Sequence, residues 1–281
     1  CVRFVAMVSS DNKPHPTVAS VLITGGGSGI GAALAIELAH RRCRVLISGR
    51  RAQPLDEVAQ LSKRISVCVG DVTDHAHRAA LATTLADLPG PRAIVHAAGY
   101  FQTGLLDILS LEQWRRSFVT NVEARWLLPC ACACAESLDE GRVLFIGSDA
   151  GGSPRAGAAA YSIAQAASET LRRALQAEWA DSSTAVGAFK PGLVDTDMVR
   201  GFMSLSEAEF PAIAAYKEYV ANGVVASPRD IARFAAWLLL DIPTQRFAAT
   251  EWDVRDVEHH AEWCDRPLYP HADPATRPDR R

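Results

Sequence analysis

The chain has 281 residues, 48% of them hydrophobic, so it can form one large α/β domain or two small ones and is not wholly disordered. Its net charge of −3 gives no reason to expect nucleic acid or an acidic membrane as a partner. No apolar run reaches the roughly 18 to 20 residues that a membrane span needs, and Val2 to Val8 lacks the flanks of a signal peptide. We therefore expect a cytoplasmic protein without a membrane partner.

The seven cysteines are odd in number, and no pair has the spacing of a metal knuckle. Cys130-Ala131-Cys132-Ala133-Cys134 is either a redox or metal cluster or a set of small apolar helix residues in a reducing compartment. On a helix Cys132 faces away from the other two, which favours the second interpretation. We expect no metal site, and His259-His260 is interpreted as a polar surface feature.

Short apolar runs alternate with helical segments along most of the chain. Residues 1–17 are interpreted as a loose extension. Strands are predicted near 18–23, 44–49, 65–69, 93–96, 143–147, 185–189 and 250–254, and helices near 32–41, 55–61, 79–88, 111–138, 158–179 and 228–240. This alternation predicts a single doubly wound Rossmann domain over residues 18–257, with a parallel sheet of about seven strands and helices on both faces.

Residues 197–226 interrupt this alternation with a long segment that contains Met198, Phe202, Phe210 and Tyr216. The segment is either ordinary packing between helices or, because it follows the carboxyl end of a strand, a lid over a substrate. Residues 258–281 are interpreted as a C-terminal tail, because the end of the chain is rich in Pro, Asp and Arg.

A glycine-rich turn, Thr24-Gly25-Gly26-Gly27-Ser28-Gly29-Ile30-Gly31, joins the first predicted strand to the first predicted helix. Such a turn lets the backbone approach a pyrophosphate, whose charge then lies at the helix N-terminus. The alternative is a tight turn that binds nothing.

The end of the second predicted strand indicates which dinucleotide would bind. In dinucleotide-binding folds an acidic side chain there accepts hydrogen bonds from a free ribose hydroxyl, whereas an arginine suits a 2′-phosphate. This strand ends in Ser48-Gly49-Arg50-Arg51, without a carboxylate, so Arg50 favours NADP over NAD. The alternative is a solvated pair of surface arginines. Asp71, after the third strand, is placed to meet the adenine amino group.

With these positions in hand, residues 18–257 resemble the short-chain dehydrogenase/reductase family. The motifs that carry the resemblance are Thr24-Gly25-xxx-Gly29-Ile30-Gly31 for the cofactor turn, Asp71-Val72 for the adenine contact, Ala98-Gly99 for the end of an Asn-Asn-Ala-Gly stretch, Asn121 in the central helix, Ser148 with Tyr161 thirteen residues later, and Pro191-Gly192-Leu193-Val194-Asp195-Thr196 for the nicotinamide side. His96-Ala97 stands where the family has its two asparagines.

The resemblance implies hydride transfer between the nicotinamide C4 and a carbonyl or alcohol carbon of a small molecule. Ser148 would hold the substrate oxygen, Tyr161 would exchange its proton, and Asn121 would orient the helix or a relay water. Cofactor contacts are implied at Gly25, Gly27, Ser28, Gly29, Ile30, Gly31, Arg50, Arg51, Asp71, Val72, Ala98, Gly99, Tyr161, Gln165, Pro191, Gly192, Val194 and Thr196. Family members often pair through the two long helices, so a homodimer or homotetramer is expected.

Gln165 departs from the family, which has a lysine four residues after the tyrosine, on the same helix face. That lysine lowers the phenol pKa and grips the nicotinamide ribose. Lowering the phenol pKa from about 10 to about 7 corresponds to roughly 4 kcal/mol, which an uncharged glutamine does not supply. The Gln165 amide can still donate to a ribose hydroxyl. Lys190 lies on another strand, so we do not treat it as a substitute.

The missing lysine affects the two reaction directions differently. Alcohol oxidation needs a tyrosinate base, whereas carbonyl reduction needs the protonated tyrosine that is present by default. We therefore predict an NADPH-dependent carbonyl reductase that acts on a hydrophobic carbonyl compound and is weak as an alcohol dehydrogenase. Two alternatives stay open: a catalytically weakened NADP-binding protein that acts as a sensor or partner scaffold, and a non-redox enzyme on the same fold.

Overall fold

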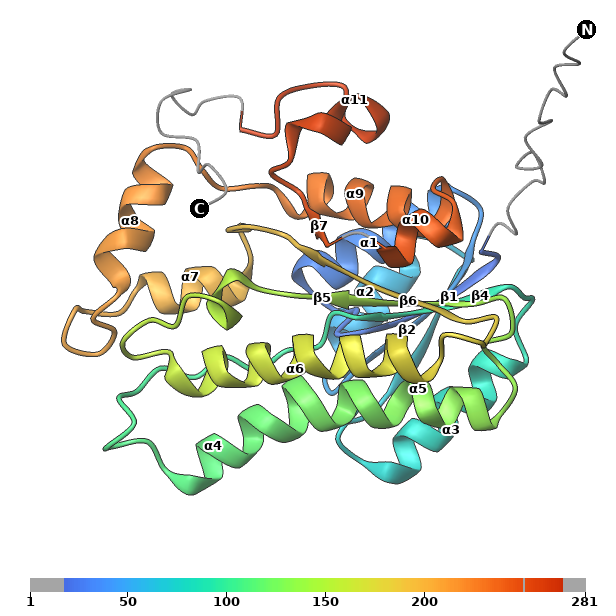
Figure 1. Cartoon of the computed structure of the whole chain (residues 1–281), viewed down its shortest axis with the longest axis horizontal. Helices are drawn as coiled ribbons and strands as arrows, with labels where there is room; N and C mark the ends of the chain where they lie inside the picture. The colour runs from blue at the N-terminus through green and yellow to red at the C-terminus, as the bar shows by residue number, and fades with distance from the viewer. Residues whose placement is uncertain (1–17, 250, 270–281) are drawn as a thin grey trace, which may run out of the picture.

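A seven-stranded parallel sheet runs through the computed structural model, which describes residues 18–249 and 251–269 (Figure 1). The strands are β1 (Ser20–Thr24), β2 (Arg44–Gly49), β3 (Ile65–Val69), β4 (Arg92–His96), β5 (Arg142–Ile146), β6 (Ala185–Lys190) and β7 (Trp252–Asp253). Their order across the sheet is β3-β2-β1-β4-β5-β6-β7. The winding reverses between β1 and β4, so a crevice is expected at their carboxyl ends, after Thr24 and His96.

The central strands are apolar on both faces because helices cover the sheet on both sides. All five residues of β1 are buried, and Val21 pairs in register with Val45 of β2 and Ala93 of β4. Successive β1 residues point to opposite faces, so Val21 and Ile23 join one apolar core while Leu22 joins the other. The predicted doubly wound fold is confirmed.

The helices form two layers. One layer contains α1 (Gly29–His40), α2 (Ala52–Gln60), α9 (Pro228–Leu240) and α10 (Thr244–Ala249), and the other contains α3 (His75–Ala86), α4 (Leu111–Phe118), α5 (Ala124–Cys134) and α6 (Ala159–Glu178). Figure 1 shows α4, α5 and α6 on one side of the sheet and α9 and α10 on the other. A π-helical turn, η1 (Val119–Glu123), joins α4 to α5, so the central helix contains a π-bulge and ends at Cys134 rather than at residue 138.

The predicted lid segment folds into α7 (Asp197–Met203) and α8 (Ile213–Ala221), which Figure 1 shows at one end of the sheet. Phe202, Phe210 and Ile213 form a small apolar cluster of their own, separate from the two large cores. This cluster also includes Ala158, and Phe101 packs against it, so the segment packs on itself and on the start of α6.

The assignment of residues 258–281 to a tail is wrong for the part that the structure describes. Residues 258–269 include η3 (Val257–His259) and α11 (His260–Trp263), and Trp263, Leu268 and Tyr269 are buried in the core that contains α9. Burial of these large apolar side chains stabilises the segment, although its polar composition suggested a tail. The extension 1–17 and residues 270–281 lie outside the described residues.

The interpretation of His259-His260 as a surface feature is also wrong. His259 is 6% exposed, stacks on Phe234 with ring centroids 5.2 Å apart, and accepts a hydrogen bond at Nδ1 from Trp263 Nε1 at 3.0 Å. Burial lowers the pKa of His259, and the neighbouring His260 lowers it further, so the ring is neutral and serves as an aromatic core residue.

The cysteine triplet lies on α5 as expected: Cys132 is buried, Cys130 is partly buried and Cys134 is exposed. In residues 18–249 and 251–269, no three His, Cys, Asp or Glu side chains gather closely enough to hold a metal ion. None of the helices in these ranges has the length and hydropathy to cross a membrane.

Candidate active site

A cleft of about 2280 Å³ opens at the carboxyl ends of the central strands. It is larger than the roughly 300–1,000 Å³ of a drug-sized ligand site, so it has room for a dinucleotide and a substrate together. Every cofactor-binding residue predicted from the sequence lines this cleft, as do Ser148, Tyr161 and Gln165. Asn121 is not among its lining residues.

The glycine turn forms a cradle that side chains would fill. Gly25 has a φ of +71°, and a Cβ there would lie 2.7 Å from the backbone nitrogen of Ala98. A Cβ on Gly31 would lie 2.3 Å from the carbonyl oxygen of Gly25. Ser28, the N-cap residue of α1, makes no side-chain capping bond, which leaves the first amides of the helix for an anion. This cradle fits a pyrophosphate.

Charged groups converge at the outer end of the cleft, after β2 and β3. Burial would raise the pKa of Asp71, but hydrogen bonds from Thr73 and the charges of Arg50 and Arg116 lower it. Asp71 Oδ1 accepts from Thr73 N at 2.9 Å and Thr73 Oγ1 at 2.8 Å. The guanidinium of Arg116, on α4, lies 4.7 Å from the ring centre of Tyr100. Arg50 and Arg116 therefore act on the same corner, and Arg116 carries no motif that marks it in the sequence.

Asn121 is fully buried in the π-helical turn η1, where its amide clamps the loop after β4. Its Oδ1 accepts from Tyr100 N at 3.0 Å, while its Nδ2 donates to Tyr100 O at 2.8 Å and to Ser117 Oγ at 3.3 Å. Both ends of the amide are thus used in positioning this loop.

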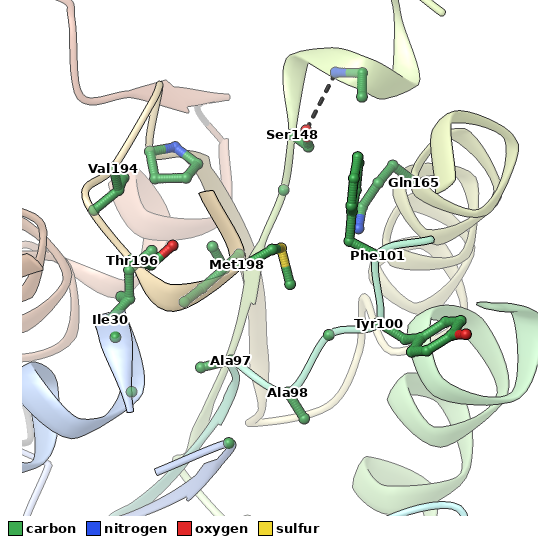
Figure 2. Close-up of a pocket in the computed structure, with 18 of the residues that line it drawn as sticks. Ile30, Ala97, Ala98, Tyr100, Phe101, Ser148, Gln165, Val194, Thr196 and Met198 are labelled. Carbon is green, nitrogen blue, oxygen red and sulfur yellow. Dashed lines mark hydrogen bonds between the residues drawn. The ribbon is translucent and has the colours of Figure 1, made fainter. Parts of the chain in front are cut away.

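Ser148 follows β5 and caps the short helix η2 (Asp149–Gly151), with its Oγ accepting from Ala150 N at 3.2 Å (Figure 2). Figure 2 shows Ser148, Phe101 and Gln165 on one side of the pocket and Ile30, Val194 and Thr196 on the other. The predicted cofactor turn and the predicted reaction residues therefore face each other across one space.

Tyr161 lies in the first turn of α6, partly buried, with its ring edge-on to Phe101 at a centroid distance of 5.1 Å. Burial raises the pKa of the Tyr161 phenol above 10. The charge of Arg125, followed by hydrogen-bonding neighbours Ser148 and Gln165, offsets only part of that rise. The phenol is therefore protonated at neutral pH.

Gln165 is 4% exposed and lies one helical turn after Tyr161 on α6. Its Oε1 is buried without a hydrogen-bond partner among the described residues. Lys190 lines the same cleft at the end of β6, but it pairs in register with Asp253 and acts on that carboxylate. Of the cations that the structure describes, the one that acts electrostatically on Tyr161 is Arg125, on α5.

Residues 19–205 match the model of the short chain dehydrogenase family, which agrees with the geometry of the cleft. The chain belongs to the short-chain dehydrogenase/reductase family. Its members are oxidoreductases that use NAD(P), and the glycine cradle of this dehydrogenase fits the pyrophosphate of such a cofactor.

Curated relatives of this short-chain dehydrogenase include bacterial enzymes of different specificity. It is 29% identical over 235 residues to 2,3-dihydro-2,3-dihydroxybenzoate dehydrogenase of Escherichia coli, covering 79% of this chain and 90% of that one. It is 30% identical over 226 residues to 3-oxoacyl-(acyl-carrier-protein) reductase of Pseudomonas aeruginosa, covering 78% and 89%. The relatives share the family but not one substrate.

Solved structures give the same fold. A protein of Beutenbergia cavernae, crystallised with NADP at low occupancy, is 28% identical, with a TM-score of 0.72 over 84% of this chain and 94% of that one. Actinorhodin polyketide ketoreductase with NADPH has a TM-score of 0.72 over 84% and 94% at 23% identity, a likeness of fold alone.

One buried residue of this dehydrogenase escaped the sequence analysis. Arg125 is 4% exposed and lines the cleft beside the reaction residues. Its signal in the sequence is an arginine one turn after Asn121, in a helix that continues with Trp126-Leu127-Leu128. An arginine on an amphipathic helix is usually solvated, so only the fold distinguishes this one from a surface charge.

Aromatic side chains cover the cleft next to Tyr161. Phe202 lies 5.2 Å from Phe101 and 4.8 Å from Tyr216 between ring centroids, and the guanidinium of Arg155 lies 4.6 Å from the Tyr216 ring centre. Met198, at the start of α7, also lines this part of the cleft. The substrate end of the site is thus mostly apolar, with one cation at its edge.

Proposed function

We propose that this protein is an NADP(H)-dependent oxidoreductase that reduces a carbonyl group of a small hydrophobic substrate to an alcohol. The observation that carries the proposal is the Tyr161 phenol, held protonated by burial in the same cleft as Ser148 and the glycine cradle. A phenol in this state is ready to donate a proton and is a poor base at neutral pH.

The choice of NADP over NAD is supported by the charges after β2. Arg50 and Arg51 line the cleft there, and Arg116 of α4 adds a third guanidinium at the same corner as Arg50. Guanidinium groups bind a phosphate bidentately, and two that converge from different elements suit the dianion of a 2′-phosphate. Asp71 Oδ1 accepts two hydrogen bonds from Thr73, and Asp71 follows β3 rather than β2, so it would meet the adenine rather than the ribose.

The glycine cradle and Arg50 would hold NADPH, which would supply a hydride to the carbonyl carbon. The Ser148 hydroxyl donates a hydrogen bond to the carbonyl oxygen and polarises it. The Tyr161 hydroxyl then gives its proton to the oxygen, which becomes the alcohol, and the electron pair of the broken O–H bond stays on the phenol oxygen. Gln165 lines the cleft, and its amide would donate a hydrogen bond to the nicotinamide ribose. This is the part of the family lysine's role that needs no charge.

The substrate is proposed to be apolar or aromatic. Phe101, Met198, Phe202 and Tyr216 line the cleft around Tyr161 and exclude water from the reacting atoms. The α7–α8 segment that carries three of them packs in an apolar cluster separate from the two large cores, which suits a lid that opens for substrate exchange.

Consumption of NADPH against a panel of aliphatic and aromatic ketones and aldehydes tests this function. We expect turnover with apolar members, faster with NADPH than with NADH, and lower by about a hundredfold to ten-thousandfold in Tyr161→Phe. Alcohol oxidation with NADP⁺ that proves as fast as reduction near neutral pH would contradict the proposed direction. Tight NADPH binding with no turnover would favour a non-catalytic cofactor-binding protein, and conversion of a compound without cofactor consumption would favour a non-redox enzyme.

We also propose that the protein forms a homodimer or homotetramer through the layer of α4, α5 and α6. On this layer Trp126 of α5 is 48% exposed and Ile163 of α6 is 40% exposed. Figure 1 shows these helices side by side on the outer side of the sheet. Large exposed apolar side chains on one layer of helices are typical of a subunit interface.

A further inference from the structure

Arg125 is a buried cation without an acidic partner. Its Nη1 donates to the carbonyl oxygen of Ile146 at 3.0 Å and to Ser168 Oγ at 3.2 Å, and its Nε is buried with no hydrogen-bond partner among the described residues. No carboxylate in the described part of the chain offsets its charge; the group that acts on it electrostatically is the Tyr161 phenol. A buried charge normally needs compensation, so this placement calls for an explanation.

The hydrogen bonds of Arg125 fix where it lies. Tyr161, Gln165 and Ser168 are spaced four and three residues apart on α6, so they line one face of that helix. Arg125 binds Ser168 on this face and acts electrostatically on Tyr161 on the same face, and Gln165 lies between these two residues along the helix. Its second anchor, the Ile146 carbonyl, lies two residues before Ser148.

The unpartnered atoms on these two side chains are complementary. Arg125 leaves a donor, Nε, and Gln165 leaves an acceptor, Oε1, both buried and both without a partner among the described residues. The pair could be joined by a small movement or by one water molecule, and the amide nitrogen of Gln165 would then be directed at the Tyr161 hydroxyl.

We propose that Arg125 replaces, from α5, the positive charge that the family places on α6, and that it stabilises the Tyr161 phenolate formed when the proton is given to the substrate oxygen. The inference rests on the proposed function. Arg125 acts through Tyr161 and is therefore a positioning residue, with Gln165 as the neutral spacer between the two. A second cation at position 165 would face Arg125 in a buried site, which accounts for an uncharged residue there.

Among the described residues, Arg125 is the cation that acts electrostatically on Tyr161. Arg155 lies at the edge of the site, 4.6 Å from the ring centre of Tyr216. His96, at the end of β4, is fully buried, and burial together with Arg125 lowers its pKa well below the usual range, so the ring is neutral. Tyr216, on α8, has its pKa raised by burial and stays protonated. Burial lowers the pKa of Arg125 itself only to about 10, so the guanidinium is charged at neutral pH.

The test measures ionisation at position 161 in the full protein with bound NADP⁺. A fluorinated tyrosine replaces Tyr161, so that the phenol ionises at lower pH and fluorine NMR reports its state. We expect Arg125→Gln, which removes the charge but keeps a donor for Ile146 and Ser168, to raise this phenol pKa by about one to three pH units. Arg125→Lys should keep most of the effect, and Arg125→Gln with Gln165→Lys should restore it.

Arg142 provides the matched control. It is 2% exposed, has its pKa lowered to about 10 by burial, and donates to the carbonyl oxygens of Leu238 and Ile242 at the opposite end of the sheet. Arg142→Gln should leave the phenol pKa unchanged even if it lowers stability. If folded Arg125→Gln also leaves the pKa unchanged, Arg125 is structural and the inference is wrong; Arg125→Met repeats the measurement should the glutamine variant not fold.

The titration also separates this inference from the proposed function. A higher phenol pKa in Arg125→Gln without turnover on any carbonyl compound would support the charge on α5 and reject the reductase. Turnover with an unchanged phenol pKa in Arg125→Gln would support the reductase and reject the role of the Arg125 charge. If both the reductase function and the charge effect hold, Arg125→Gln should oxidise alcohols more slowly at any pH below the phenol pKa. The rate should fall by the same factor as the phenolate fraction, which drops about tenfold for each unit by which the phenol pKa rises.

Discussion

Arg255 donates from Nη2 to Asp149 Oδ1 at 2.8 Å, across 106 residues of sequence. The same guanidinium binds Asp253 through Nε at 2.8 Å and Nη2 at 2.5 Å. Asp149 is the residue after Ser148, so this pair ties the turn that carries the candidate substrate-binding serine to the strand β7. The position of Ser148 thus depends on a segment that the sequence places near the end of the chain.

Loss of this tie should cost both stability and activity. Asp253 is 7% exposed, so Arg255→Met leaves a buried carboxylate without its cation, and we expect about 3 kcal/mol less unfolding free energy. Urea unfolding measures this. As a control, Arg233→Met removes an exposed pair with Asp265 and should cost far less, because water screens that pair. Equal losses in the two variants would show that the Asp253 pair is no stronger than a surface pair.

Asp253 also predicts a loss of stability in acid. Burial would raise its pKa, but hydrogen bonds and charge from Arg255, with a smaller contribution from Lys190, lower it below 3.8. A carboxyl group with a lowered folded-state pKa contributes its full stabilisation above the unfolded value and loses it as pH falls through the folded value. Unfolding midpoints measured from pH 7 downward should therefore fall less steeply below about pH 4 in Asp253→Asn than in the natural protein. Parallel curves would contradict this.

The glycine cradle can be tested with two alanine substitutions. In Gly25→Ala the methyl group would lie 2.7 Å from the backbone of Ala98 at a φ of +71°, so we expect about 1–2 kcal/mol of backbone strain, an added clash, and at least about tenfold weaker NADPH binding. Gly201, on α7, has nothing within 4 Å of a Cβ, and Gly201→Ala should stabilise the protein by about 0.5–1 kcal/mol. Calorimetric titration and thermal unfolding measure the two effects, and similar NADPH affinity in both variants would argue against the cradle.

Arg50 should determine the choice between the two nicotinamide cofactors. Loss of a charge-assisted hydrogen bond costs about 1.5–3 kcal/mol, so Arg50→Met should weaken NADPH binding by roughly tenfold to a hundredfold and leave NADH binding unchanged. Fluorescence titration with each cofactor measures this. Lys63→Met, an exposed cation in the turn before β3, should change neither affinity. A loss of NADH binding as large as that of NADPH would mean that Arg50 does not contact the 2′-phosphate.

The proposed subunit interface predicts a change in molecular mass. Trp126→Glu places a charge on the exposed face of α5, and light scattering should then report monomers where the natural protein forms dimers or tetramers. Val257 is 69% exposed and lies outside the α4–α6 layer, so Val257→Glu should leave the mass unchanged. A monomeric natural protein would end the proposal.

Local patterns were sufficient where a residue's role depends on its immediate neighbours in the chain. The turn from Gly25 to Gly31 needs glycine because backbone meets backbone there, and this requirement is readable from the sequence. The helix predicted over 228–240 has the bounds of α9, which Ser227 caps and Pro228 begins. Parallel strands ending at one edge then bring Ser148, Tyr161 and the glycine turn into one cleft.

Contacts between segments that are distant in the sequence could not be predicted from local sequence patterns. His259 is a core residue because Phe234, Trp237 and Trp263 surround it, and residues 265–269 are ordered because Leu268 and Tyr269 find the same core. Asn121 was expected to orient the helix or a relay water; the structure shows its amide bound to the backbone of Tyr100, 21 residues away in the sequence.

The sequence by itself determined the fold, the cofactor cradle and the absence of a lysine at position 165. Each follows from spacing along one strand or helix. Only the tertiary structure decided that Arg125 of α5 is buried in the same cleft as Tyr161 and acts on it electrostatically, because electrostatic interaction depends on distance in space rather than on separation in the chain.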